Sequence, residues 1–276
     1  MAAAAEIAAQ RAPISSYHEF LTSLLSDRER FFEEVVSNTG LVKKLRYGVG
    51  TVVVLSGCFG LVAGAYSGPA QALSAALKLP FLFFATFAVC FPAFFVVQVL
   101  VGSRLRLLQV VVLVIGALAL TSVLLAAFVP IAAFFLITGA HYYFQHLLHI
   151  ALAGIAGLFG MYALHDGLTV VCEKRGVYPR KALTIMRAWA VLFAFVGIQL
   201  AWNLRPFLGD RNQPFRVFGQ YEGNFYTAVI YAVNQLLKAP EKSSTAPARL
   251  DTLALFRELL TPRVDTLADT ARRHRP

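Results

Sequence analysis

Hydrophobic residues fall into five long runs that short polar stretches separate. A helix needs about 20 mostly apolar residues to cross a hydrocarbon core of ~30 Å. The run from 107 to 138 exceeds that length, so it either tilts or breaks at Pro130. The pattern predicts an all-α fold, a polytopic transmembrane helix bundle of about five spans. The predicted spans are residues 47–66, 80–101, 107–138, 150–171 and 183–204.

A shorter segment between the first two spans has its own start and stop signals. Pro69 suits the first turn of a helix, and Pro80 disfavours helical geometry in the residue before it. A helix of about ten residues is only ~15 Å long, which is too short to span. We therefore expect a short re-entrant or interfacial helix. Its polar face, formed by Gln71, Ser74 and Lys78, is expected to meet water.

The first span carries a row of small residues, Gly57, Gly60 and Gly64. Small residues at spacings of three and four let two membrane helices approach closely. We expect another helix to pack on this row.

The N-terminal segment is predicted to form amphipathic helices. Ser16 with Glu19, and Ser26 with Glu29, match the capping-box pattern at a helix start. Apolar residues at helical spacing continue to a predicted stop at Gly40. This segment either lies on the membrane surface or packs against the other helices.

The chain becomes more polar after the last predicted span. Residues 225–237 are expected to form a helix too short for a sixth span, 240–247 a linker, and 250–273 a second amphipathic helix. The chain thus divides into an amphipathic N-terminal segment, a five-span bundle, a juxtamembrane cap, and a linker with the C-terminal helix. The bounds of these parts are 1–46, 47–204, 205–239 and 240–276.

Composition supports the membrane class. Of the 276 residues, 58% are hydrophobic and only 14% are charged, and the mean hydropathy is +0.63. The net charge of +10 does not indicate nucleic-acid binding, because the basic residues cluster at the ends of apolar runs. The connections at 41–46, 102–107 and 172–187 are the basic ones, which predicts a cytoplasmic N-terminus and an exported cap. We expect a multipass protein of the inner membrane.

Three stretches resemble uncharacterised bacterial multipass inner-membrane proteins: SGPAQALSAALKLPFL (67–82), GSRL (102–105), and AWNLRPFLGDRNQPF with EGNFY (201–226). More distantly, the five-span topology over 47–204 resembles the Yip family of Rab-interacting membrane proteins. The Yip resemblance implies membrane-trafficking partners. Neither resemblance implies a catalytic residue.

Two groups of ionisable residues lie in or beside the predicted fourth span. His141, His146 and His149 lie among aromatic residues, which is typical of a membrane interface, although imidazoles at such spacing can also share a metal ion. His165 and Asp166 lie inside the span, where ionisable residues are costly and are candidates for function. Pairing of Asp166 with a basic residue such as Arg187 is the structural alternative.

A third candidate group is expected on the exported face, where Gln71, Lys78, Trp202 and Arg205 would line a polar cap. The three cysteines lack zinc or disulfide spacing, and no nucleophile elbow, P-loop or HExxH motif is present. We expect no cofactor, metal or nucleic acid, and no enzyme. The favoured function is the organisation of membrane lipids or protein partners through the amphipathic terminal helices and the exported cap, and the alternative is a small channel or transporter.

Overall fold

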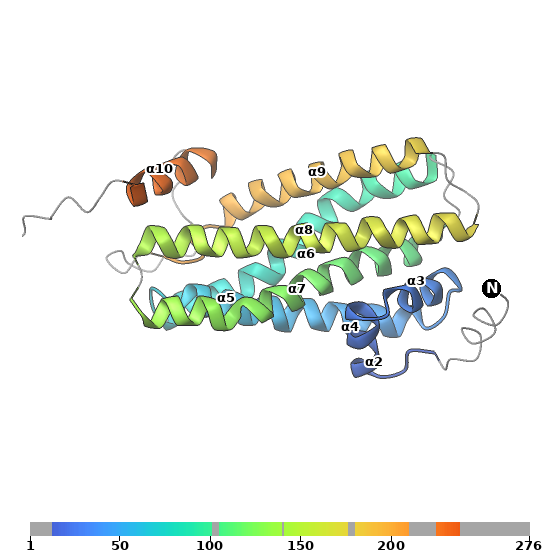
Figure 1. Cartoon of the computed structure of the whole chain (residues 1–276), viewed down its shortest axis with the longest axis horizontal. Helices are drawn as coiled ribbons and strands as arrows, with labels where there is room; N and C mark the ends of the chain where they lie inside the picture. The colour runs from blue at the N-terminus through green and yellow to red at the C-terminus, as the bar shows by residue number, and fades with distance from the viewer. Residues whose placement is uncertain (1–12, 101–104, 140, 176–179, 210–224, 238–276) are drawn as a thin grey trace, which may run out of the picture. The chain divides into compact units, whose positions relative to one another are not determined.

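A computed structural model describes residues 13–100, 105–139, 141–175, 180–209 and 225–237 (Figure 1). Within these ranges, residues 98, 167, 168, 170–175 and 180–187 are described by their helical backbone alone. The chain divides into a compact unit, Met1–Leu236, and a second unit, Leu237–Pro276. The predicted linker and C-terminal helix lie outside the described residues.

The described part of the chain contains helices and no strand. A short hairpin, α2 (Tyr17–Leu25) and α3 (Arg28–Val36), precedes the long helices. One continuous helical segment is formed by α4 (Leu41–Thr51), the π-helical turn η1 (Val52–Ser56) and α5 (Gly57–Gly64). The remaining helices are α6 (Pro69–Leu100), α7 (Leu107–Ile137), α8 (Tyr142–Arg175), α9 (Arg180–Leu204) and α10 (Phe225–Leu237).

Four helical segments of the described chain are long and apolar enough to cross a membrane. They are Leu41–Gly64, Pro69–Val97, Leu107–Ile137 and Tyr142–Asp166. They fit an integral membrane protein and confirm the predicted class, an all-α helical bundle. Helix α9 adds a shorter apolar stretch, Ala188–Leu204, so a count of five spans stays a prediction.

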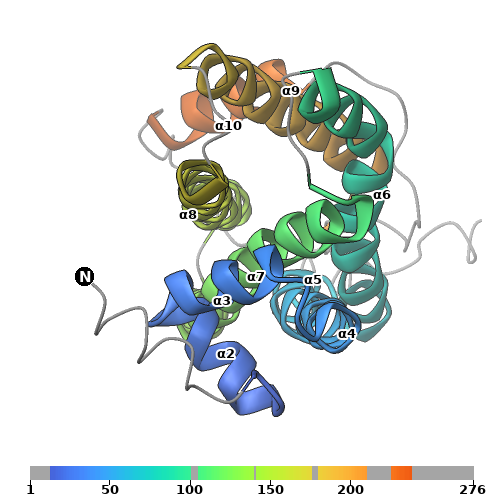
Figure 2. The same ribbon diagram turned by 90° about the vertical axis from the view of Figure 1, so that its right-hand side faces the viewer.

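Helix α7 is the central helix of the described unit. Every residue from Val112 to Ser122 is buried, as expected for a helix that is apolar on all sides. Helix α4 packs on one side of α7 and α8 on another, while α9 packs on α6 (Figure 2). Helices α8 and α9 make few contacts with each other, and a cavity lies between them.

The expected short helix is not a separate element. Helix α6 runs without interruption from Pro69 through Pro80 and Pro92, so the predicted stop at Pro80 is wrong. Proline removes one helical hydrogen bond, but in a membrane bundle neighbouring helices can accommodate the freed carbonyl. Here that carbonyl belongs to Ala76, and it faces Gly57 of α5.

Two other predicted boundaries are also corrected by continuous helices. Helix α7 passes through Pro130, so the alternative of a break at that proline is wrong. Helix α8 begins at Tyr142, which places most of the aromatic, histidine-rich segment inside the helix rather than before a span starting at residue 150.

The predicted glycine row is a close contact between α5 and α6. A Cβ atom on Gly60 would lie 2.5 Å from the carbonyl oxygen of Ala75. One on Gly64 would collide with the backbone of Gln71 and Ala72. The row therefore lets two backbones meet directly, which confirms the packing prediction.

The N-terminal helices pack against the bundle, which favours the predicted packing on other helices over the alternative of lying on the membrane surface. Phe20 and Phe31 are buried in a core that includes residues of α4 and α7. The Ser16–Glu19 capping box is present, but α3 begins after Asp27, whose carboxylate accepts from the Arg30 N–H. The predicted second box and the stop at Gly40 are wrong. Helix α3 ends at Val36, and Gly40, with a φ of +62°, precedes α4.

Candidate functional site

The first candidate site joins the start of α6 to the segment after α9. Its donors are side chains of Ser67, Gln71 and Lys78, and its acceptors are the carbonyl groups of residues 206–208. Gln71 Nε2 donates to the Pro206 carbonyl at 2.6 Å and to the Phe207 carbonyl at 3.2 Å. Lys78 Nζ donates to the Pro206 carbonyl at 3.1 Å, and Ser67 Oγ to the Leu208 carbonyl at 2.7 Å. We call this group the carbonyl-anchor cluster.

The carbonyl-anchor cluster is buried within the protein. Gln71 is 4% exposed and Lys78 is 7% exposed, so the expectation that these side chains meet water is wrong. Residues 206–208 lie outside any helix, and their carbonyls need donors from elsewhere in the protein. Hydrogen bonding to these carbonyls explains why polar side chains on α6 turn inward.

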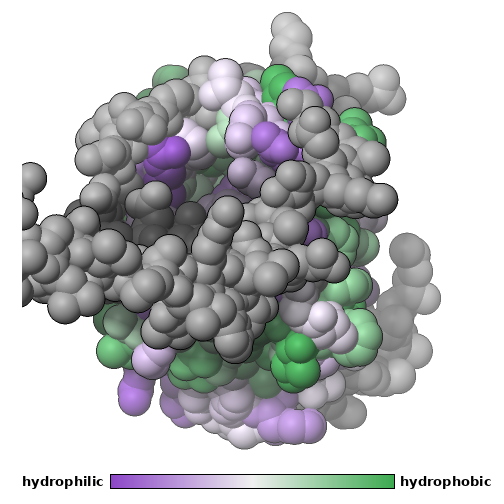
Figure 3. All heavy atoms as spheres, turned by 90° about the vertical axis from the view of Figure 1, so that its left-hand side faces the viewer, coloured by the Kyte–Doolittle hydropathy of each residue, from purple (hydrophilic) through white to green (hydrophobic). Residues whose placement is uncertain are grey.

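Trp202 and Arg205 lie beside this cluster in sequence and contact each other. The guanidinium carbon of Arg205 lies 3.7 Å from the centre of the Trp202 ring, a cation–π contact. The Trp202 ring also meets Phe225 at the start of α10 edge-on, with centroids 6.4 Å apart. The sequence-predicted cap residues thus come together in the described structure. Figure 3 faces this end, where hydrophilic side chains stand among hydrophobic ones.

The histidines at the start of α8 do not form a metal site with other described residues. His141 is exposed, and the His146 ring stacks on Tyr142. The Nδ1 atom of His149 lies 2.7 Å from the Gln145 carbonyl, and its ring lies 5.4 Å from that of Phe59. No group of three His, Cys, Asp or Glu residues in the described part of the chain could hold a metal ion.

Gln145 is a candidate that the sequence analysis missed. Its side chain is fully buried, and neither polar atom of its amide has a hydrogen-bond partner among the described residues. The Nε2 atom of His149, one helical turn further, is in the same state. Buried polar groups without partners are rare and mark sites of interest. The signal that could have found this position is a lone amide side chain between the aromatic residues and histidines of 141–149.

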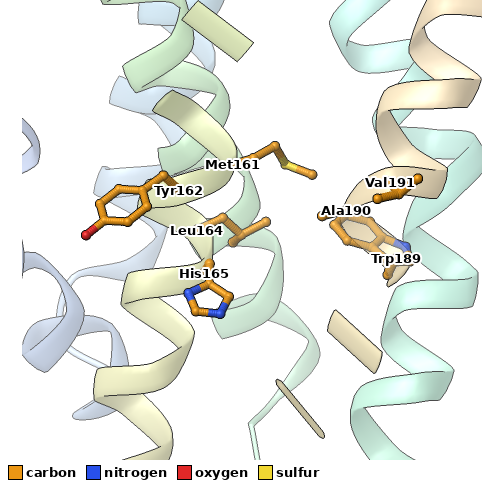
Figure 4. Close-up of a pocket in the computed structure, with 7 residues that line it drawn as sticks. All are labelled: Met161, Tyr162, Leu164, His165, Trp189, Ala190 and Val191. Atoms are coloured by element: carbon orange, nitrogen blue, oxygen red, sulfur yellow. The ribbon is translucent and has the colours of Figure 1, made fainter. Parts of the chain in front are cut away.

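A second candidate site is a cavity of about 420 Å³ between α8 and α9. Met161 and Leu164 extend from α8 toward α9, Trp189 faces them, and Tyr162 turns to the other side of α8 (Figure 4). The Trp189 ring stacks on Phe94 at 4.1 Å, and its N–H donates to the Cys90 carbonyl at 3.3 Å. Thus α6 fixes one wall of the cavity. The lining residues are Met161, Tyr162, Leu164, His165, Trp189, Ala190 and Val191.

His165, which the sequence analysis names as a candidate, provides a polar group at this cavity. Its Nε2 atom is buried and has no hydrogen-bond partner among the described residues. Its neighbour Asp166 is half-buried. The side chain of Arg187 is not among those described, so the pairing of Asp166 with Arg187 stays a prediction.

A buried ion pair near the N-terminus also escaped the sequence analysis. Lys44 Nζ lies 2.7 Å from Glu34 Oε2 and donates to the Thr39 carbonyl at 2.6 Å. The same carboxylate accepts from the backbone N–H of Ile14 and from Arg30. This arrangement fixes the N-terminal hairpin on α4, so its role is structural.

Gln109 makes the matching connection to α7. Its Nε2 atom donates to the carbonyls of Val35 and Val36 at 2.8 and 3.0 Å, and its Oε1 atom accepts from the Arg106 N–H. The last carbonyls of α3 are therefore paired with a side chain of α7.

Comparisons of the chain with protein-family models, with curated proteins and with solved structures found no match.

Proposed function

We propose that the protein is a non-catalytic integral membrane protein that organises membrane lipids or protein partners. The observation that carries this proposal is that its buried polar side chains bond to other parts of the protein. Gln71, Lys78 and Gln109 donate to backbone carbonyls, and Lys44 pairs with Glu34. These groups hold elements together. A transport path instead needs ionisable groups that face a wet cavity.

The cavity between α8 and α9 supports the same proposal. It is lined mostly by apolar residues. Its lining residue Val191 is 70% exposed, and Leu158 of α8, three residues before the lining residue Met161, is 73% exposed. In a membrane such a surface meets lipid. The bundle thus offers lipids a shaped apolar surface.

We further propose an inner-membrane location with a cytoplasmic N-terminus. The start of α4, the start of α7 and the end of α8 share one end of the bundle (Figure 1). That end carries Lys43, Arg46 and Arg106, and the basic residues of the stretch 172–187 belong to the last turn of α8 and the first turns of α9. Positive residues favour the cytoplasmic side.

The second candidate function is a small channel or transporter. It is favoured by polar atoms of Gln145, His149 and His165 that have no hydrogen-bond partner within the described part of the chain, since water or a solute would satisfy them. These positions lie on one helix that is long enough to span the membrane.

Reconstitution distinguishes the two functions. The purified protein is incorporated into liposomes for ion and small-solute flux, and in parallel it is extracted in mild detergent for native mass spectrometry. The proposal predicts flux equal to that of protein-free liposomes, together with retained lipid or a copurifying protein. Flux above the liposome background, lost on replacing Gln145 with Leu, would establish the transporter instead.

A further inference from the structure

The cavity between α8 and α9 combines three features that together identify an occupant. Its wall is mostly apolar, its volume of about 420 Å³ lies within the ~300–1,000 Å³ range of ligand sites, and two of its lining residues, Tyr162 and Val191, are exposed on the surface of their helices. In a membrane that surface borders hydrocarbon. The molecules that surround the cavity there are lipids, so a lipid acyl chain can enter it.

The cavity is also close to a concentration of positive charge. Lys174 and Arg175 end α8, Arg180 and Lys181 begin α9, and Glu173 is the acidic residue in that stretch. Lys174 follows Leu164 by ten residues and Lys181 precedes Trp189 by eight. Along a helix these separations are about 15 Å and 12 Å, no more than half of a ~30 Å hydrocarbon core. A lipid with its phosphate at the basic end can therefore place a chain in the cavity.

His165 provides the polar group at the cavity. Its buried Nε2 atom has no partner among the described residues, and in the tautomer that carries the proton on Nε2 it can donate to a lipid ester oxygen. Asp166, the next residue, is half-buried and would oppose an anion that came close to it. The anionic group is therefore expected toward the basic helix ends rather than at Asp166.

We infer that the cavity between α8 and α9 holds an acyl chain of an anionic phospholipid whose phosphate lies toward the basic ends of the two helices. This inference rests on the proposed function, because it names the class of lipid that the protein binds. Basic residues near a membrane surface favour anionic over zwitterionic headgroups. The apolar wall favours a chain, and the basic ends select the headgroup.

Trp189 makes the inference testable, since the chain has two tryptophans and the other is Trp202. In the Trp202→Phe variant, Trp189 is the remaining fluorophore. The variant is reconstituted in phosphatidylcholine vesicles that contain increasing fractions of phosphatidylglycerol brominated on its acyl chains. A parallel titration uses phosphatidylcholine brominated on its acyl chains. Bromine quenches tryptophan fluorescence at short range, so quenching of Trp189 reports acyl chains that enter the cavity.

We expect phosphatidylglycerol to quench Trp189 at a mole fraction about fivefold lower than phosphatidylcholine does, the preference that one basic residue near an anionic headgroup provides. Ala190→Phe, which fills the cavity, should remove this difference. Ala194→Phe is the matched control, because Ala194 is an exposed residue of the same helix outside the cavity lining. Equal quenching by both lipids, or a preference that survives Ala190→Phe, would overturn the inference.

Native mass spectrometry of the unmodified protein gives a second reading that needs no variant. After incubation with equal amounts of unbrominated phosphatidylglycerol and phosphatidylcholine, the inference expects the anionic lipid to be retained preferentially. Equal retention contradicts it. A protein that copurifies without lipid selectivity would leave the proposed function standing and remove the inference. Solute flux together with selective quenching would contradict the proposed function and leave the inference standing.

Discussion

The side-chain amide of Gln71 donates a hydrogen bond of 2.6 Å to the carbonyl oxygen of Pro206, although 135 residues separate them in sequence. This contact joins the first turns of α6 to the segment that follows α9. Both partners belong to the stretches that the sequence singles out, 67–82 and 201–226. The contact gives a structural reason for polar residues in an otherwise apolar helix.

Replacing Gln71 with Leu should destabilise the bundle, because the part-buried Phe207 carbonyl then loses the Gln71 donor and the Pro206 carbonyl keeps only that of Lys78. An unpaired buried acceptor costs about 1–3 kcal/mol. Thermal unfolding in detergent measures the effect. Leu73→Ala, on the exposed side of the same helix, is the control and should change stability by about 0.5 kcal/mol or less. Equal effects of the two substitutions would show that the hydrogen bonds contribute nothing.

The α5–α6 contact predicts opposite outcomes for two glycine-to-alanine changes. Gly64→Ala should destabilise, since its Cβ collides with the backbone of Gln71 and Ala72. Gly50→Ala should be neutral or stabilising by about 0.5–1 kcal/mol, because nothing lies within 4 Å of a Cβ there and alanine favours helix. Thermal shifts of the two variants provide the comparison. A Gly64→Ala variant as stable as Gly50→Ala would exclude close backbone packing.

The fold class could be predicted because apolar runs of spanning length leave few alternatives to a helical bundle. Helix ends were predicted less well. A proline is a local stop signal, yet α6 passes through Pro80, where Gly57 of the neighbouring helix gives space to the Ala76 carbonyl. That accommodation depends on tertiary packing, which the local pattern does not contain.

The candidate sites show the same limit. Gln71, Lys78, Trp202 and Arg205 could be grouped from topology alone, but the inward direction of the α6 side chains depends on the carbonyls of 206–208. The cavity beside His165 arises because α8 packs on α7 and α9 packs on α6. Two helices that follow each other in sequence need not pack together, so periodicity alone did not reveal the cavity.

Because Lys44 forms a buried ion pair with Glu34, it should contribute more to stability than the adjacent Lys43 does. Lys44→Met should destabilise by about 1–3 kcal/mol, below the 3–5 kcal/mol typical of breaking a buried pair, because Ile14 and Arg30 still contact the Glu34 carboxylate. Lys43→Met changes an exposed residue and should be nearly neutral. Chemical denaturation of both variants measures the difference. Equal midpoints would contradict a structural role for the pair.

Glu19 should make the N-terminal helix sensitive to acid. The backbone N–H groups of Ser15 and Ser16 donate to its carboxylate and hold its pKa below the ordinary value of 4.5. A lowered folded pKa stabilises the folded state above the unfolded pKa, and this contribution is lost as pH falls through the folded value. The protection of the α2 amides against hydrogen exchange, expressed relative to the intrinsic exchange rate at each pH, should therefore fall in the wild type below about pH 4.5. Glu19→Gln should show faster exchange already at pH 6 and less change on acidification, whereas parallel pH profiles would contradict the capping role.

The two ends of α7 should be accessible from opposite sides of the membrane. Arg106 and His141 are exposed residues that flank this helix, whose 31 residues extend about 46 Å and exceed a ~30 Å hydrocarbon core. Cysteine introduced at either position, after replacement of the native Cys58, Cys90 and Cys172, can be labelled with a membrane-impermeant thiol reagent. In intact cells the reagent should reach position 141, and position 106 should react once the membrane is opened, since basic connections favour the cytoplasm. Labelling of both positions in intact cells would contradict a membrane-spanning α7, and the reverse pattern would invert the proposed orientation.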